Sequence, residues 1–224
     1  MTRHVDEPPE EMGSAESRVA IVCFVVFSIV WTALAIAPHD RPTWLLENLL
    51  ILATVPALVA TRHRFRFSDR AYVQIAAFLL LHAVGSHYTY SEVPAGAWLR
   101  DNLDLSRNHY DRIVHFAFGL LFLRPLLELS IGKARGLGPF AIGWIGVAGI
   151  AALSTIYELL EWLAVMVVDP DAGTAFLGTQ GDEWDAQKDT ALACAGAIVA
   201  LFLEDRRTFF PLPGRRARRD SQAQ

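Results

Sequence analysis

Acidic and imidazole side chains interrupt the apolar segments of this 224-residue chain at regular positions. Three pairs of them are separated by three or four residues, which places both members of a pair on one face of a helix. Such groups are costly inside a membrane and are usually retained for proton, ion, metal or catalytic work. We therefore predict one catalytic group. Its members are Asp111, Arg112, His115, Glu158, Glu161, Asp185 and Asp189.

The polar stretch from His82 to Phe116 lies between two apolar runs and carries four of the seven histidines. Loops that carry ionisable and aromatic groups between membrane spans are where function tends to be located. We predict that residues of this stretch and of two others bind a substrate. They are His82, His87, Tyr88, Glu92, Arg107, His109, Tyr157, Trp162, Gln180 and Asp182.

Two specific chemistries remain open for these residues. Imidazole with carboxylates suits zinc or a harder divalent metal, although no motif such as HExxH is present. The metal ligands would be His115, Glu158, Glu161 and Asp185. A serine nucleophile, Ser86 or Ser154 with His115 and Asp111, is a weaker alternative because the chain lacks a GxSxG motif. The structural alternative is an ion network that only locks the helices together.

The elements that must position these residues are long apolar segments. Hydrophobic residues make up 53% of the chain, the mean hydropathy is +0.29, and the apolar residues come in blocks. A helix needs about 20 apolar residues to cross a bilayer core. The fold class predicted is all-α, a polytopic bundle of six transmembrane helices with short loops. The expected spans are 18–37, 44–60, 71–86, 108–129, 140–168 and 186–203.

The distribution of basic residues predicts the orientation in the membrane. Residues 1–17 are expected to form a disordered tail, 18–205 the transmembrane domain and 206–224 a basic tail. The Arg-rich loop 61–70, the turn with Lys133 and Arg135, and the basic tail all lie on one side of a six-span protein. Because basic loops stay in the cytoplasm, both termini are predicted to be cytoplasmic.

The same topology brings the polar residues of four spans to one membrane depth. We therefore expect a polar cavity that opens toward the outer face. The polar groups do not continue through the cytoplasmic half, where Arg124 and Glu128 are expected to form a local pair one helical turn apart. Membrane lipids are the expected partners, nucleic acid is not, and a homo-oligomer remains open. The two cysteines, Cys23 and Cys194, lie in apolar windows and imply no disulfide.

Four segments carry a resemblance to a known family. They are HYTYSEVPAGAWL, LSRNHYDRIVHF, YELLEW and FLGTQGDEWDAQKD. In these segments the chain resembles the YjdF family of bacterial inner-membrane proteins, an uncharacterised integral membrane family, from the second span to the sixth. The resemblance implies a membrane fold and no particular activity.

A more distant similarity is to VanZ-like proteins, which are associated with glycopeptide-antibiotic resistance. Their helix start Asp-Lys-x-x-His-Phe matches residues 111–116, with Arg112 in place of lysine. Their acidic motif matches Glu158 or Glu161, and their Asp-x-x-x-Asn start matches Asp185 and Asp189, with an extra acid in place of asparagine. This resemblance implies a shared helical core and an envelope-lipid role.

Three functions are compatible with these observations. The first is an envelope enzyme or accessory factor that acts on a lipid or an amphipathic small molecule. The second is a proton-coupled transporter, which the missing internal repeat disfavours. The third is a structural membrane partner without catalysis. No cofactor is identified, and a divalent metal is the one candidate.

Overall fold

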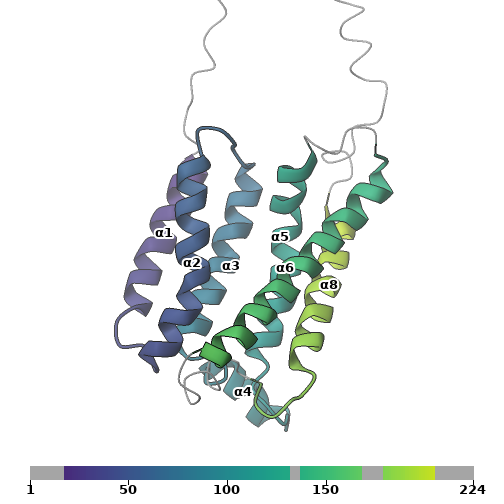
Figure 1. The fold of residues 1–224 in the computed structure, drawn as a ribbon. Helices are drawn as coiled ribbons and strands as arrows, with labels where there is room; N and C mark the ends of the chain where they lie inside the picture. Colours follow the sequence, from purple (N-terminus) through teal and green to yellow (C-terminus); the bar gives the residue numbers. More distant parts are fainter. Residues whose placement is uncertain (1–17, 132–136, 168–178, 205–224) are drawn as a thin grey trace, which may run out of the picture.

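The computed structural model describes residues 18–131, 137–167 and 179–204. Within these residues the chain forms six long helices that alternate in direction and a short helix, α4, that lies at one end of the bundle (Figure 1). The long helices are α1 (Arg18–Leu34), α2 (Arg41–Thr61), α3 (Asp69–His87), α5 (Tyr110–Ile131), α6 (Pro139–Val167) and α8 (Asp185–Leu203). The predicted tails, 1–17 and 206–224, lie outside the described residues. We call the two ends of the bundle the α4 end and the opposite end.

The prediction of an all-α membrane protein is confirmed, and the helix bounds lie within a few residues of the predicted spans. The number of spans is supported only in part. By length and hydropathy, four of the described helices can cross a membrane, namely α2, α5, α6 and α8. Helix α1 is apolar but has 17 residues. Helix α3 carries Asp69, Arg70 and Gln74 in its first turns, which lowers its hydropathy.

Among the described residues, the polar stretch between α3 and α5 contains a helix that the sequence did not predict. Helix α4 (Pro94–Asn102) begins with a proline at its first turn, where the missing N–H has no intrahelical partner to lose. The side chain of Asn108 then packs against Gly96 and donates to the carbonyl of Val93, 3.0 Å away. The same side chain accepts from the backbone N–H of Tyr110, 3.0 Å away, at the start of α5. Asn108 thus joins both ends of this segment to the bundle.

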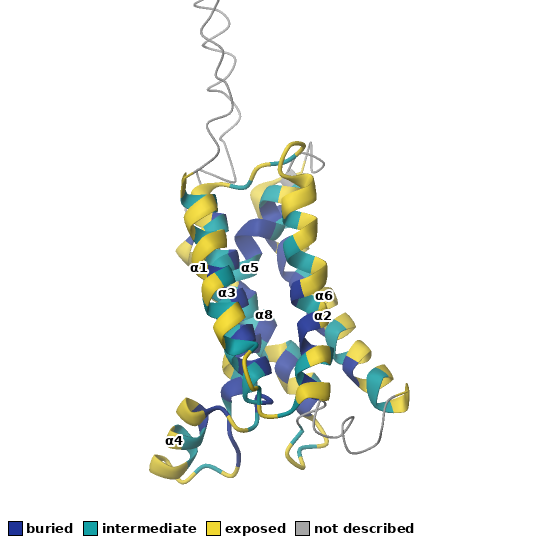
Figure 2. Cartoon of the chain, turned by 90° about the vertical axis from the view of Figure 1, so that its left-hand side faces the viewer, coloured by how far each residue is buried: buried dark blue, intermediate teal, exposed yellow. Residues whose placement is uncertain are grey.

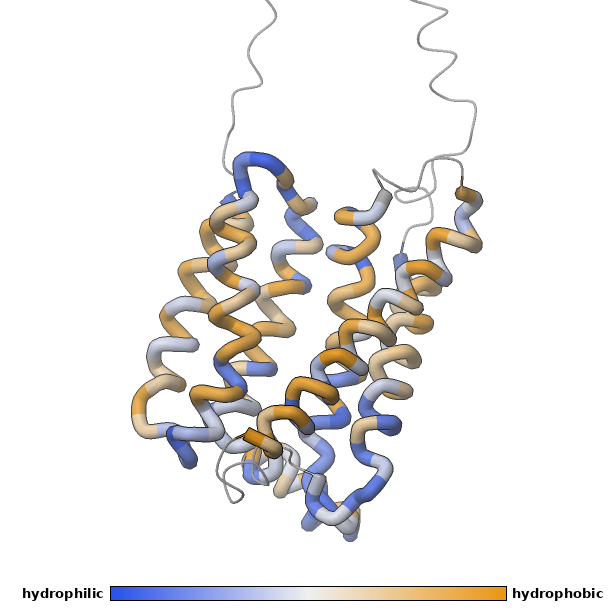
Figure 3. The backbone as a smooth tube through the Cα atoms, in the orientation of Figure 1, coloured by the Kyte–Doolittle hydropathy of each residue, from blue (hydrophilic) through white to orange (hydrophobic). Residues whose placement is uncertain are grey.

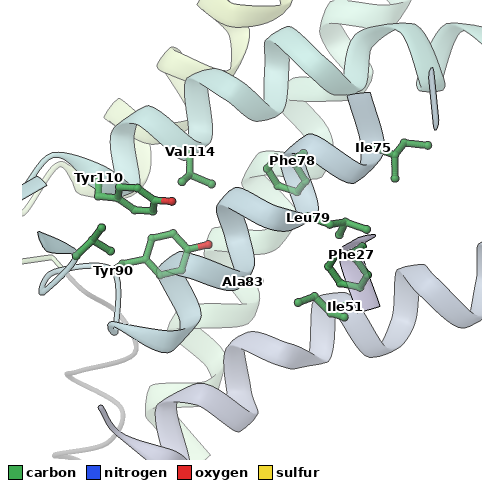
Figure 4. Packing of buried hydrophobic residues seen from close by; sticks show 10 residues of the cluster. Phe27, Ile51, Ile75, Phe78, Leu79, Ala83, Tyr90, Tyr110 and Val114 are labelled. Carbon is green, nitrogen blue, oxygen red and sulfur yellow. The ribbon is translucent and has the colours of Figure 1, made fainter. Parts of the chain in front are cut away.

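Two apolar clusters hold the long helices together. The first connects α1, α2, α3 and α5 and includes Phe27, Ile51, Phe78 and Val114 (Figure 4). The second lies between α5, α6 and α8 and includes Leu123 and Ile150. Buried residues line the inner faces of the helices, and exposed residues cover their outer faces (Figure 2). Many of the exposed residues are large and apolar, as a membrane environment requires (Figure 3).

Helices α5 and α8 are in backbone contact, and this contact sets the geometry of the polar residues. A Cβ on Gly119 would lie 1.8 Å from the carbonyl oxygen of Ala193, and one on Gly196 would lie 2.0 Å from that of Phe116. Small residues of this kind allow membrane helices to approach closely. Because the contact lies within one to two turns of His115 and Asp189, it brings the side chains of these two residues together.

Candidate functional site

The centre of the site is the imidazole of His115 on α5, which is buried among carboxylates. Its Nε2 lies 3.2 Å from Oε1 of Glu158 on α6 and 3.6 Å from Oδ1 of Asp111, one turn earlier on α5. Asp189 on α8 completes the group, because ligand atoms of Asp111, His115 and Asp189 all lie within 4.8 Å of one another. We call Asp111, His115, Glu158 and Asp189 the carboxylate site.

The other ring nitrogen of His115 is held by Ser154. Its Nδ1 lies 3.3 Å from the Ser154 hydroxyl oxygen, on the same α6 face as Glu158. When Nδ1 donates its proton to that oxygen, the lone pair of Nε2 faces the oxygens of Asp111 and Glu158. This arrangement requires a positive charge between nitrogen and oxygens, either a proton or a metal ion.

Two oxygens of the carboxylate site have no hydrogen-bond donor. Within the described residues, Oε1 of Glu158 and Oδ1 of Asp189 are buried and accept no hydrogen bond, although His115 Nε2 is near the first. Asp189 is 1% exposed. An unpartnered buried acceptor costs about 1–3 kcal/mol, more when it is charged. The site is therefore suited to receive a ligand that donates protons or carries positive charge.

A second polar layer lies beside the carboxylate site and contains Glu47 of α2, a residue that sequence reasoning missed. The Tyr157 hydroxyl donates to Oε2 of Glu47, 2.8 Å away. The Glu47 carbonyl lies 3.0 Å from Nε2 of His82, and the other ring nitrogen of His82 is hydrogen-bonded to the hydroxyl of Tyr90. Burial raises the pKa of Tyr90 well above its usual value, so its hydroxyl stays protonated.

Glu47 could have been found from the sequence. It is an acid near the start of the apolar run 44–60, and an ionisable residue within a membrane span suggests a functional site by itself. Tyr90 offered no such signal. It reaches His82 because Thr89 and Tyr90 both adopt positive φ angles, 53° and 54°, which turns the chain back over Gly85.

A cavity of about 270 Å³ opens between α2, α3, α5 and α6. Its polar lining comes from both layers, and the rest of its wall is mostly apolar. The polar residues are His82, Tyr90, Asp111, His115, Ser154 and Tyr157, with Thr54 further along α2. The apolar wall includes Leu50, Phe78, Phe118 and Phe122. A cavity with this division fits an amphipathic molecule whose polar group reaches His115.

At the α4 end, an ion network separates the carboxylate site from the surface. Arg107 pairs with Asp185, and Arg112 pairs with Asp182 and lies 3.3 Å from Oδ1 of Asp185. Lys188 donates to Asp182 over 2.6 Å. We call these five residues the mouth network. Its hydrogen bonds from Lys188 and Arg112 lower the pKa of Asp182 to about 2.

Two further predicted residues support the mouth network. His109 lies 3.3 Å from Arg112, and burial together with the charges of Arg112 and Arg107 lowers the pKa of its imidazole. Gln180 holds the backbone of Asn108, accepting from its N–H at 3.0 Å and donating to its carbonyl at 2.9 Å. Because Arg107 also donates to the carbonyl of Thr179, 3.0 Å away, the start of α8 is fixed to the start of α5.

Of the ten predicted substrate-binding residues, His82 and Tyr157 line the cavity. Four others belong to the mouth network or support it, and the remaining four lie elsewhere. His87 contacts the carbonyl of Leu34 at 2.7 Å, and the Tyr88 ring packs against the His39 ring. Glu92 lies 3.0 Å from Nδ1 of His39. Trp162 is 56% exposed and does not line the cavity. The first three join the link between α1 and α2 to the end of α3, which is a packing role.

The predicted metal ligands are not all adjacent. Asp185 is engaged by Arg107 and Arg112, whereas His115 and Glu158 are in contact. Glu161 is buried one turn beyond Glu158 and is close enough to interact electrostatically with Glu158, Glu47 and Asp111. The two serines considered as nucleophiles, Ser154 and Ser86, lie in different surroundings. Ser154 contacts His115, while Ser86 donates to the carbonyl of His82, 2.9 Å away.

A different ion network closes the opposite end. Arg124 pairs with Glu204, its Nε donating over 2.9 Å, and Arg70 lies 3.5 Å from the same carboxylate. The predicted local pair of Arg124 and Glu128 is present at 3.5 Å, but Glu128 mainly accepts from the backbone N–H and hydroxyl of Ser68. We call these five residues the opposite-end network. They tie α3, α5 and the end of α8 together.

The apolar outer surface and the buried acids define a multi-pass helical membrane protein. The chain belongs to the family described as "Predicted membrane protein (DUF2238)", whose profile matches residues 19–208. It is 35% identical over 166 residues to the "Inner membrane protein YjdF" of Escherichia coli strain K12, which covers 74% of this chain and 79% of that protein. No solved structure matches it significantly. The resemblance to the YjdF family is therefore confirmed, and the inner membrane is the location that it supports.

Proposed function

We propose that this protein is an inner-membrane enzyme that acts on the polar head of an amphipathic, lipid-like molecule. The observation that carries the proposal is the cavity between α2, α3, α5 and α6, which is apolar along most of its wall and ends at His115, Ser154 and Tyr157. The apolar wall would bind a hydrocarbon chain. The polar end would bind the head group beside the imidazole.

In this proposal Glu158 transfers the proton, and the imidazole of His115 positions its carboxyl group. Nε2 of His115 lies 3.2 Å from Oε1 of Glu158, so the carboxyl group can hold or release a proton beside the ring during the reaction. Ser154 orients the ring through Nδ1 and is not a nucleophile. The backbone N–H groups around Ser154 are bonded within α6, so they are not free to stabilise the oxyanion that would form on a substrate carbonyl attacked by its hydroxyl.

The proposal includes a topology of six spans with both termini in the cytoplasm, so that the α4 end faces outward. The alternation of the six long helices supports it, as does the Arg-rich loop at the opposite end. Reporter fusions after Asp101 and Asp171 should be active outside, and fusions after Arg135 and Arg207 inside. An outside signal after Arg207 would contradict the six-span topology.

A structural observation disfavours the transport alternative. A carrier needs polar access from both sides, and the cavity wall toward the opposite end is formed by Phe78, Phe118 and Phe122. Beyond these rings, the basic groups Arg70 and Arg124 are paired with Glu204 and Glu128. Within the described residues, polar access is thus limited to the α4 end.

The proposal is tested by extracting the protein in native membrane particles and identifying bound amphipathic molecules by mass spectrometry. Thr54→Trp should fill the cavity and remove the enriched species. Leu52→Trp, on the exposed face of the same helix, is the matched control and should keep it. His115→Gln should retain the molecule but stop its conversion. If no species is enriched, or if Thr54→Trp and Leu52→Trp behave alike, the proposal is wrong.

A further inference from the structure

We infer that the carboxylate site binds one divalent metal ion, held by Asp111, His115 and Asp189. The first support is geometric. One ligand atom from each of these residues lies within 4.8 Å of the others, which is close to the span of donors around one ion. The residues come from two helices, α5 and α8, whose backbones are in contact through Gly119 and Gly196. Little movement is needed to bring the ligands to bonding distance.

The second support is independent of the clustering of acids. Asp189 is 1% exposed, and within the described residues its Oδ1 has no hydrogen-bond donor. Oε1 of Glu158, on the facing helix α6, is also buried and accepts no hydrogen bond, although Nε2 of His115 lies 3.2 Å away. A single proton on His115 Nε2 can satisfy only one of these oxygens. A metal ion at the centre would contact oxygens from several carboxylates at once.

The basic side chains nearest to the carboxylate site are hydrogen-bonded to other acids. Arg112 makes its hydrogen bonds to Asp182, Asp185 and His109, and Lys188 pairs with Asp182. These two basic groups therefore balance the acids of the mouth network. The carboxylate site beside it holds three acids and one imidazole, so a divalent ion would offset two of its negative charges.

The ligand set indicates which ion to expect. One imidazole nitrogen with carboxylate oxygens suits Zn²⁺ or Mn²⁺ better than Ca²⁺, which prefers oxygen ligands alone. Ser154 would act through His115. By accepting the proton of Nδ1, its hydroxyl would leave Nε2 free to bind the metal, as outer-shell partners of metal-binding histidines generally do.

The inference deepens the proposed function, and the role of the ion in catalysis rests on that function, whereas the binding of the ion does not. A bound ion would attract a phosphate or carboxylate head group to the polar end of the cavity. The ion therefore narrows the proposed substrates to amphipathic molecules with an anionic head.

The test is metal binding by the full-length, tag-free protein in detergent. After treatment with a chelator and dialysis, the protein is titrated separately with Zn²⁺ and Mn²⁺, and bound metal is measured by elemental mass spectrometry. The wild type should bind one equivalent. Asp189→Asn should lose this binding, and Ser154→Ala should weaken it by about 10- to 100-fold. Asp101→Asn, on the exposed surface of α4, should bind like the wild type.

Melting curves with and without the ion show that each variant is folded, and Co²⁺ absorption provides a second readout of nitrogen and oxygen ligation. The inference is overturned if the wild type binds no ion, or if Asp189→Asn and Asp101→Asn bind it equally. These outcomes differ from a failure of the proposed function. Metal bound without any amphipathic substrate would contradict the proposed function and leave metal binding intact. Substrate conversion that survives the chelator would contradict the catalytic role of the ion.

Discussion

Two polar regions of the bundle, the opposite-end network and the carboxylate site, both bury acidic groups, but only the first of these two pairs its acids with basic groups. In the opposite-end network, Arg70 and Arg124 face Glu128 and Glu204, and Glu128 also receives two hydrogen bonds from Ser68. The carboxylate site has three acids around one imidazole, and within the described residues two of its buried oxygens accept no hydrogen bond. Removing one partner from a balanced buried network destabilises the fold, whereas an unbalanced site is costly without a ligand. The comparison therefore separates the scaffold from the site.

The largest expected effect is at the balanced end. Arg124→Ala would leave Glu204 buried without its main partner and should lower the free energy of unfolding by about 3–5 kcal/mol. The measurement is denaturant or thermal unfolding of the purified protein in detergent. Arg100→Ala, on the half-exposed surface of α4, is the control and should change little. Equal losses for the two variants would show that the opposite-end network does not stabilise the fold.

The mouth network should give an intermediate effect. Arg112→Ala removes the contacts to Asp182 and Asp185, and we expect a loss of about 1–3 kcal/mol, since the side chain is 17% exposed. The same unfolding measurement applies. If Arg112→Ala melts like Arg100→Ala, Arg112 is not paired with the start of α8.

A smaller effect of opposite sign distinguishes two buried acids, Asp189 on α8 and Glu204 just after it. In the presence of a chelator, Asp189→Asn should leave stability unchanged or raise it by about 1 kcal/mol, because it relieves repulsion from Asp111 and Glu158. Glu204→Gln at the opposite end should lower stability, because Arg124 loses its counter-charge. Destabilisation by both variants would mean that the carboxylate site is also a balanced structural network.

The pH dependence of the mouth network is the smallest effect. The folded-state pKa of Asp182 is lowered to about 2, against about 3.9 in an unfolded chain. Its contribution to stability is therefore present above about pH 4 and is lost as the pH falls toward 2. Melting temperatures over this window should fall more for the wild type than for Asp182→Asn. Parallel curves would indicate that Lys188 and Arg112 do not hold Asp182 ionised.

Much of this comparison could be predicted from the sequence. The apolar blocks predicted the long helices, because burial in a membrane requires apolar segments of about this length. Helical spacing and alternating direction also placed His115, Glu158 and Asp189 at one depth. The pairing of Arg112 with acids at the start of the last span could be predicted from their shared depth. Most other partners on other helices could not be predicted, since periodicity contains no information about which helices touch. Asp185 therefore looked like a metal ligand before Arg107 and Arg112 were seen to bind it.

Some functional residues were not predicted for the same reason, because their contacts depend on how the helices pack. Glu204 lies just beyond the end of α8, and only the packing of α5 against α8 shows that Arg124 reaches it. Tyr90 enters the cavity through a turn with positive φ angles that no residue type in that turn requires. Conversely, the predicted substrate-binding group contained His87, Tyr88 and Glu92 because they lie in the same polar stretch as His82. In the structure these three residues contact His39, in the link between α1 and α2.

The central claim is that the carboxylate site performs a function and is not a scaffold. Its most direct test is complementation of a strain that lacks its own member of this family, using Glu158→Gln together with Glu161→Gln. We predict that this variant accumulates in the inner membrane at the wild-type level and melts at or above the wild-type temperature, but fails to restore the phenotype. Full complementation by the same variant would contradict the claim and leave the carboxylate site a structural element.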